Sequence, residues 1–233
     1  MDVEERFRAV AALIGEPARA TMLWSLLDGK ALTATELAIR ADVSAQSASM
    51  HLNKLVQADL LAVESQGRHR YYRFRRPETA YVIEALANLV TPHDTKTLPL
   101  SHAHSATTST GIRYCRTCYD HLAGKVAVEI TNRLVHQKIV QLENDHYNVT
   151  RKGQQWFNTL GIDTESLQHE RRQFARRCLD WSERKPHLAG SLGAALLNTW
   201  IDSGCVTRQK NTRATTLTVK GQQGLYKLLG LNL

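Results

Sequence analysis

The stretch from residue 43 to residue 74 constrains the fold more than any other part of the chain. It reads as a polar helix with a clear start, followed by a β-hairpin with a basic tip. Ser44 is a good N-cap, because its hydroxyl can accept a hydrogen bond from the first turn of the following helix. Apolar side chains then recur on one helical face: Ala45, Ala48, Leu52, Leu55 and Val56. No acidic side chain lies between residues 43 and 58, so the other face is polar without being negative. Such a helix fits the major groove of DNA, and a basic hairpin tip can reach the phosphates beside it.

The residues before this helix predict a helix-turn-helix. Thr33 and Glu36 form a capping box, in which the hydroxyl caps the helix and the carboxylate reaches back to the backbone. The box opens a short helix that ends near Arg40, and residues 41–43 make a tight turn before Ser44. Two short helices separated by three residues are typical of this motif.

A hairpin and flanking helices complete the expected N-terminal domain. Gln66 and Gly67 supply a turn between two β-prone runs, 61–65 and 68–74. Five arginines lie in or just after the second run, with Glu64 as the single nearby acid: Arg68, Arg70, Arg73, Arg75 and Arg76. Further helices are expected over 7–14, 17–27 and 78–90.

Composition places the chain among globular proteins. It has 233 residues, 42% apolar and 22% charged, with a net charge of +8 that favours an anionic partner. No run approaches the length of a membrane span, and the acidic start does not read as a signal peptide. Four cysteines without regular pairing argue against a disulfide scaffold, so we expect a cytoplasmic protein without a membrane partner.

A linker divides the chain into two parts. Residues 91–110 are rich in Thr, Ser, His and Pro and poor in apolar residues. The linker's His93, His102 and His104 could bind a metal adventitiously, but a solvated linker is the favoured interpretation. We therefore expect a DNA-binding and dimerisation domain over 1–90 and a C-terminal domain over 111–233 that senses an effector or reinforces the dimer.

The C-terminal part contains an internal repeat. The run Cys118–Gly124 is matched by Cys178–Gly190, which carries an insert, and Val149–Gln155 is matched by Leu217–Gln223. The copies extend over about 113–162 and 175–231. Each is expected to run helix, helix, hairpin, helix, and a helix over 163–181 is expected to join them. The expected fold class is mainly α with small β-hairpins: a winged helix-turn-helix domain followed by two winged-helix-like repeats.

Residues 7–90 resemble the ArsR/SmtB family of winged-helix repressors. The match is carried by Gly15–Arg19, Glu36–Ala38, Val43-Ser44, Ser49–Leu52 with Leu55, and the wing Gly67–Arg73. The resemblance implies a homodimeric repressor that leaves double-stranded DNA when an inducer binds. It also implies that helix 44–54 enters the major groove, and that the first and last helices of the domain pair across the dimer. The operator should then be an imperfect palindrome with half-sites roughly 34 Å apart.

The chain departs from the metal-sensing members of that family. Their thiolate site lies on the helix before the recognition helix, where residues 36–42 contain no cysteine. Their other site lies on the last helix, where this chain offers only Glu84, with His93 and Asp94 just past its end. Both standard sensor sites are therefore expected to be missing.

Ten residues are predicted to contact DNA. Gln can pair with adenine, Ser is adaptable, and Lys and Arg reach guanine or phosphate. The set is Thr33, Ser44, Gln46, Ser47, Ser49, His51, Lys54, Arg68, His69 and Arg70. The alternatives are a solvated helix face and arginines that merely protect an exposed strand edge. His51 could instead pack beside the wing.

The repeat pairs a set of possible metal ligands. Cys118, Asp120 and His121 have counterparts in Cys178, Asp180 and His187. A pseudo-twofold could bring Cys118, His121, Cys178 and His187 together as a site for a thiophilic metal. The alternatives are buried cysteines and capping histidines, or a site for an organic effector. DNA binding itself needs no cofactor.

An enzyme is the rival class. Cys115 and Cys118 form a Cys-x-x-Cys pair, which by itself is a weak redox signal. The chain shows no oriented triad, phosphate loop or cofactor fingerprint, so a non-enzymatic regulator is favoured over a thiol redox protein. Cys205 is expected in the core, and a basic cluster, Arg171, Arg172, Arg176 and Arg177, is expected to be solvated or paired.

Overall fold

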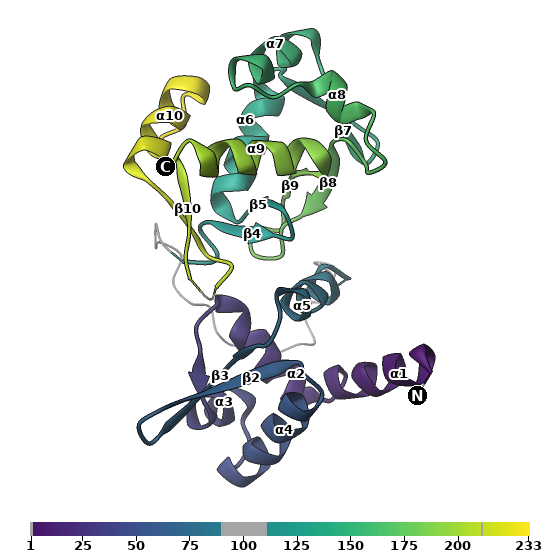
Figure 1. Ribbon diagram of the computed structural model, residues 1–233, viewed down its shortest axis with the longest axis vertical. Helices are drawn as coiled ribbons and strands as arrows, with labels where there is room; N and C mark the ends of the chain where they lie inside the picture. The colour runs from purple at the N-terminus through teal and green to yellow at the C-terminus, as the bar shows by residue number, and fades with distance from the viewer. Residues whose placement is uncertain (1, 90–110, 211) are drawn as a thin grey trace. The chain divides into compact units, whose positions relative to one another are not determined.

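The computed structural model describes residues 2–89, 111–210 and 212–233 (Figure 1). The chain forms two compact units, residues 1–87 (unit 1) and 88–233 (unit 2). The linker predicted over 91–110, with His93, His102 and His104, lies outside the described residues. Within the described residues, no helix is both long and apolar enough to cross a membrane.

Unit 1 is built from helices and one small sheet. Its elements are α1 (Val3–Ile14), α2 (Pro17–Ser25), the 3-10 turn η1 (Leu26–Asp28), β1 (Leu32–Thr33), α3 (Ala34–Ala41), α4 (Ala45–Gln57), β2 (Leu61–Gln66), β3 (His69–Phe74) and α5 (Pro77–Leu89). The strands form an antiparallel sheet in the order β1-β3-β2. The core contains apolar side chains from α2, α3 and α4, and among them Ala48, Leu52 and Leu55 belong to the apolar face that the sequence predicted. The set is Met22, Leu23, Leu37, Ala48, Leu52 and Leu55.

Local signals fix the helix-turn-helix as predicted. Thr33 and Glu36 make the full capping box at the start of α3. Asp42 ends that helix in the left-handed conformation, with φ of 53°. The Ser44 hydroxyl then accepts a hydrogen bond of 3.2 Å from the Ser47 N–H and caps α4. The sharp reversal between α3 and α4 is therefore encoded in these few side chains.

The wing is a hairpin with a two-residue loop. Gln66 pairs with His69, so Gly67 and Arg68 form the turn. Gly67 has φ of +61°, the conformation that glycine permits at the first central position of such turns. The predicted hairpin is confirmed, but its turn lies one residue later than the predicted Gln66-Gly67, so that Arg68 belongs to the turn and not to the second strand.

Two helices of unit 1 keep apolar side chains on the surface. α1 has no buried residue, and Phe7 is 70% exposed. α5 turns its small residues Ala80 and Ala87 inward with Ile83, and leaves Val82 and Leu86 exposed. The buried side chains of α5 and its exposed apolar side chains therefore lie on different faces of the helix.

Unit 2 contains four hairpins and five helices among its described residues. Its first half has β4 (Arg116–Cys118), β5 (His121–Ala123), α6 (Lys125–His136), β6 (Val140–Glu143), β7 (His146–Val149) and α7 (Arg151–Thr159). α8 (Thr164–Gln168) follows, then β8 (Arg176–Leu179), β9 (Pro186–Ala189), α9 (Gly190–Asp202), β10 (Val206–Arg208), β11 (Thr215–Leu217) and α10 (Val219–Leu229). From β4 to α7 and from β8 to α10 the order is the same: hairpin, helix, hairpin, helix.

Two secondary-structure predictions for unit 2 are wrong. Each copy begins with a hairpin, not with a helix. The joining helix expected over 163–181 is limited to α8, and Arg176 already starts β8, which pairs with β7 and β9. A continued helix would have stacked Arg172 on Arg176 one turn apart, and like charges at that spacing destabilise a helix.

The repeated Thr-x-Lys-Gly motif ties each second hairpin to the helix before it. The Thr150 hydroxyl accepts from the Gly153 N–H at 3.0 Å and donates to the Lys138 carbonyl at 2.7 Å. The Lys152 ammonium donates to the Gln137 carbonyl at 2.9 Å. A Cβ at Gly153 would lie 2.0 Å from a backbone carbonyl oxygen, so only glycine fits. The second copy makes the same contacts through Thr218, Lys220 and Gly221.

Candidate DNA-binding surface and Cys–His centre

The outer face of α4 is exposed and carries no acid. Gln46, Ser49, Met50 and Lys54 are all exposed, and Ser47 is partly so. The Ser44 hydroxyl accepts the capping hydrogen bond of α4. Ser44 would therefore contribute to DNA binding mainly through its position at the N-terminus of the helix. Because backbone N–H groups at a helix N-terminus attract phosphate, the cap and the polar face point to one anionic partner.

Two of the predicted DNA-contacting side chains also make contacts within unit 1. The His51 ring is partly buried, with Nδ1 3.4 Å from a Glu16 carboxylate oxygen and 3.3 Å from the Arg19 guanidinium. The Thr33 hydroxyl is occupied by Glu36, at 2.8 Å. His51 joins α4 to the start of α2, so we leave it out of the proposed DNA contacts.

The basic residues at the tip of the wing are exposed and make no ion pair among the described residues, unlike those nearer its base. Glu64 neutralises Arg73 lower in the hairpin, with 2.7 Å between the carboxylate oxygen and Nε. The Asp59 carboxylate forms ion pairs with both Arg75 and Arg76, with nitrogen-to-oxygen distances of 3.3 and 2.6 Å. Within the described residues, Arg68, His69 and Arg70 at the tip are exposed and make no ion pair. The positive charge of the hairpin is therefore concentrated at its end.

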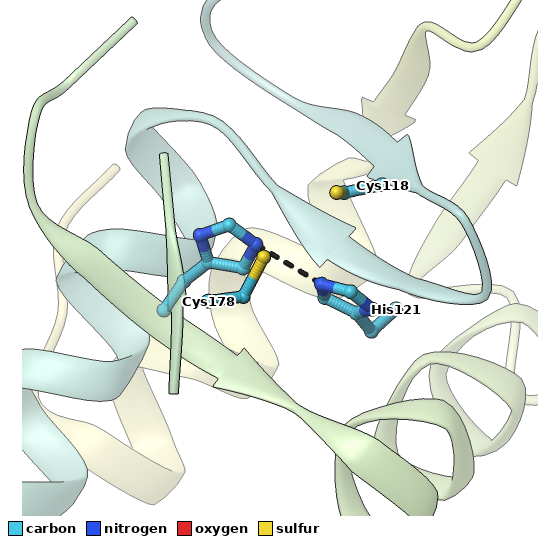
Figure 2. Close-up of side chains that lie close together, drawn as sticks. Cys118, His121 and Cys178 are labelled. Atoms are coloured by element: carbon cyan, nitrogen blue, oxygen red, sulfur yellow. Dashed lines mark hydrogen bonds between the residues drawn. The ribbon is translucent and has the colours of Figure 1, made fainter. Parts of the chain in front are cut away.

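Unit 2 brings together the four side chains that the repeat had paired. Cys118 lies opposite His121 in the β4–β5 register, and Cys178 lies opposite His187 in the β8–β9 register. Residues in register share one face of a hairpin. The four ligand atoms lie within 4.8 Å of one another, and the Nε2 atoms of the two histidines are 3.1 Å apart, the contact dashed in Figure 2.

A carboxylate stands behind each imidazole. Asp120 lies 3.4 Å from Nδ1 of His121 and is itself held by the Arg172 guanidinium at 2.6 Å. Asp180 lies 3.7 Å from Nδ1 of His187. A buried guanidinium fixes Asp180 at 2.9 Å: Arg116 is 1% exposed and the Asp180 side chain is fully buried. Both carboxylates thus approach the ring nitrogen that faces away from the centre.

The electrostatics of the centre follow from burial and from these contacts. The side-chain hydrogen bond with Cys178, together with burial, raises the pKa of the Cys118 thiol to about 11. Burial lowers the pKa of His187. Burial also acts to lower the pKa of His121, but the hydrogen bonds with Asp120 and Cys118 outweigh it, so that pKa is raised. The Cys118 thiol is therefore protonated at neutral pH.

Cys115 does not join this group. It is fully buried, and its sulfur accepts a hydrogen bond from the Thr215 hydroxyl at 3.1 Å. Burial raises the pKa of the Cys115 thiol to about 11, the opposite of what a reactive thiol needs. Cys205, expected in the core, is partly buried and packs against the main apolar cluster of unit 2.

Sequence reasoning missed the arginines that hold the two carboxylates. Arg116 and Arg172 lie outside the repeated motifs and occur among other arginines. The matched aspartates were the available signal, because a buried carboxylate needs a cation or several hydrogen-bond donors. The predicted basic cluster is in part paired: Arg172 binds Asp120, and Arg177 lies 3.3 Å from Asp145.

Comparisons with known proteins agree with the geometry of unit 1. A family model described as a helix-turn-helix domain matches residues 14–64. The uncharacterized HTH-type transcriptional regulator YdfF of Bacillus subtilis (strain 168) is 40% identical over 224 residues, covering 96% of this chain and 97% of the relative.

Solved structures that are similar to this chain match less than half of it in the two examples that follow. The transcriptional repressor BigR from Xylella fastidiosa is 20% identical and covers 39% of this chain and 94% of its own, with a TM-score of 0.34. The cadmium metal-sensor CmtR from Mycobacterium tuberculosis is 22% identical and covers 43% and 97%, with a TM-score of 0.31. From the relative that matches 96% of the chain, with the family model and the fold of unit 1 in agreement, the chain belongs to the HTH-type transcriptional regulators, and unit 1 has a winged helix-turn-helix fold.

Proposed function

We propose that the chain acts as a homodimeric, sequence-specific repressor that leaves its operator when an effector binds unit 2. The observation that carries the DNA contacts is the exposed, acid-free face of α4 combined with a wing tip that makes no ion pair in the described residues. Gln46 and Lys54 would read base edges or phosphate, and Arg68 and Arg70 would hold the backbone beside them.

The exposed apolar residues of α1 and α5 support a dimer. Phe7 on α1 and Val82 and Leu86 on α5 are exposed to water on the surface of a single chain. Burying apolar side chains is favourable, so an exposed apolar surface is typical of an interface. A twofold pairing of these helices would bury them and would set two α4 helices on one face. Two recognition helices roughly 34 Å apart imply an imperfect palindrome as operator.

A cavity between the two copies bears on the kind of effector. It is lined by Leu122, Ala127, Ile130, Thr131, Leu188, Gly193, Leu196, Leu197 and Trp200, and it has a volume of about 20 Å³. Pockets for organic ligands usually hold roughly 300 Å³ or more. This space is therefore too small for an organic effector.

The DNA contacts are tested on a duplex selected from a random library by the wild-type chain. We expect Lys54→Ala and Arg70→Ala each to lower the slope of log affinity against log salt by about 0.9 per lost phosphate contact. Gln46→Ala should lower discrimination against a changed base by roughly 5- to 150-fold. Lys227→Ala on α10 removes the same charge from unit 2 and serves as the control. Affinity and salt slope equal to the control in both basic variants would refute the assignment.

The dimer is tested by sedimentation of the full chain. Phe7→Glu together with Leu86→Glu should shift the wild-type dimer toward monomer and weaken operator binding in parallel. Val219→Glu changes an exposed apolar residue of unit 2 and should leave the assembly intact. A wild-type chain that sediments as a monomer would overturn the dimer.

A further inference from the structure

We propose that Cys118, His121, Cys178 and His187 bind one tetrahedral divalent d10 cation, of which Zn²⁺ is the type, and that this ion is the effector. Ion binding stands on the geometry of the four side chains alone. The effector role rests on the proposed function, so the two parts are tested separately.

The spacing of the four side chains matches a tetrahedral ion. Zn–N bonds of 2.0–2.1 Å and Zn–S bonds of about 2.3 Å set two nitrogens about 3.3 Å apart and two sulfurs about 3.8 Å apart. The two Nε2 atoms here are 3.1 Å apart, and all four ligand atoms lie within 4.8 Å. Shifts on the order of 1 Å, within reach of side-chain rotation, would close the shell.

The backbone holds the ligands before any ion arrives. Each hairpin presents one cysteine and one histidine in register, so strand pairing fixes their separation. Figure 2 shows Cys118 and His121 on one hairpin and Cys178 on a strand of the other. A metal would therefore join the first hairpin of one copy to the first hairpin of the next.

The centre contains a buried polar atom without a hydrogen-bond partner among the described residues. His187 is fully buried, and its Nδ1 has no hydrogen-bond partner in the described structure. The two Nε2 atoms face each other, and they can form a hydrogen bond only if one of them carries the proton. A cation between the rings removes this conflict, because both Nε2 lone pairs then bind the ion and both Nδ1 atoms carry protons.

The carboxylates complete the arrangement. Asp120 and Asp180 are placed to accept those Nδ1 protons, as carboxylates do behind metal-bound imidazoles. The charges also balance: two thiolates neutralise a divalent cation, and each aspartate already has an arginine, Arg172 or Arg116. A buried centre without excess charge avoids the cost of an isolated ion.

The ligand set also selects the class of ion. Two thiolates and two imidazoles in a closed tetrahedral shell suit Zn²⁺ or Cd²⁺, whereas Mg²⁺ and Ca²⁺ require oxygen ligands. A thiolate is the ligand form of cysteine, so binding releases two protons from Cys118 and Cys178 to the buffer.

Ion binding is tested on the full chain after treatment with a chelator. Co²⁺ serves as the optical probe, and Zn²⁺ then competes with it. We expect one ion per chain, with sulfur-to-cobalt charge-transfer bands that Zn²⁺ abolishes. Cys118→Ser and Cys178→Ser should each lose the bands, whereas Cys205→Ser, a cysteine outside the group, should keep them.

A second variant guards against misfolding of the serine variants. Asp120→Asn leaves all four ligands in place and should weaken Zn²⁺ binding by roughly 10- to 100-fold. Asp145→Asn, which also removes a carboxylate paired with arginine, is the matched control and should bind as wild type. The site is overturned if the wild-type chain binds no stoichiometric ion, or if the double variant C118S/C178S binds as tightly as C205S.

The effector role has its own readout. With one equivalent of Zn²⁺, affinity for the selected duplex should fall by roughly 5- to 150-fold in the wild type and remain unchanged in C118S/C178S. Stoichiometric binding without any change in duplex affinity would overturn the effector role while the metal site stands. Loss of duplex binding under all conditions would overturn the proposed function instead.

Discussion

The buried ion pair between Arg116 and Asp180 allows a quantitative test of how unit 2 is held together. The guanidinium is 1% exposed, the carboxylate is fully buried, and their atoms lie 2.9 Å apart. Arg116 also stacks over Trp181, with 4.9 Å from its carbon to the ring centroid. Asp180 accepts further hydrogen bonds from the backbone of Gly124 at 2.7 Å and of Ser182 at 2.9 Å.

Removing one partner of such a pair leaves an uncompensated charge, which typically costs about 3–5 kcal/mol. The loss of stability for Asp180→Asn should lie at the upper end of this range. The Asn amide group would face hydrogen-bond donors that the carboxylate now satisfies. Arg116→Met should lie near about 3 kcal/mol, because Gly124 and Ser182 continue to stabilise the orphaned carboxylate. The double variant should cost clearly less than the two losses together, since it leaves no buried charge behind.

Urea unfolding followed by tryptophan fluorescence measures these losses. Trp156, Trp181 and Trp200 all lie in unit 2 and report on its transition. The slope of each transition should match the wild type, which shows that the same surface unfolds. Single losses below about 1 kcal/mol, or a fully additive double variant, would refute the argument that the pair is a coupled, desolvated unit.

Three further predictions concern local structure. Ser44→Ala should lower the stability of unit 1 by about 1 kcal/mol in urea unfolding, and Ser44→Asp should restore it; a neutral alanine would contradict the capping role. Gly153→Ala should cost about 3 kcal/mol or more, whereas Gly224→Ala, whose added Cβ meets its nearest atom at 3.9 Å, should be neutral or slightly stabilising. The backbone N–H of Thr33 holds the pKa of the Glu36 carboxyl below its ordinary 4.5. The stability it contributes is therefore present above that pH and lost as pH falls below it. Thermal unfolding should show the gap between wild type and Glu36→Gln closing on acidification, and a constant gap would argue against it.

The helix-turn-helix could be predicted because its signals are local. The capping box, the N-cap of α4 and the glycine turn of the wing each act within four residues of themselves, and the structure shows all three. Predicting which face of α5 is exposed required more information than the periodicity of its apolar residues. Both of its faces carry apolar residues, and which of them is buried depends on tertiary packing.

The repeat could predict which side chains of unit 2 correspond, but not which elements carry them. Cys118 and His121 face each other across a turn in which Tyr119 adopts φ of 59°, a conformation rare for a tyrosine. The turn contains no glycine or asparagine that would predict it, so the sequence of this segment is equally compatible with a helix. The roles of Arg116 and Arg172 depend on contacts across more than fifty residues of sequence, which no local pattern encodes.

The matched register of the two Cys–His hairpins has a consequence for how such a centre can arise. Each copy carries one thiol and one imidazole, which is half of a four-coordinate shell. A single-copy ancestor that paired with itself would have assembled the same four donors around a symmetry axis. After fusion of two copies into one chain, assembly of the four side chains would no longer depend on protein concentration. Each half could then acquire its own loop.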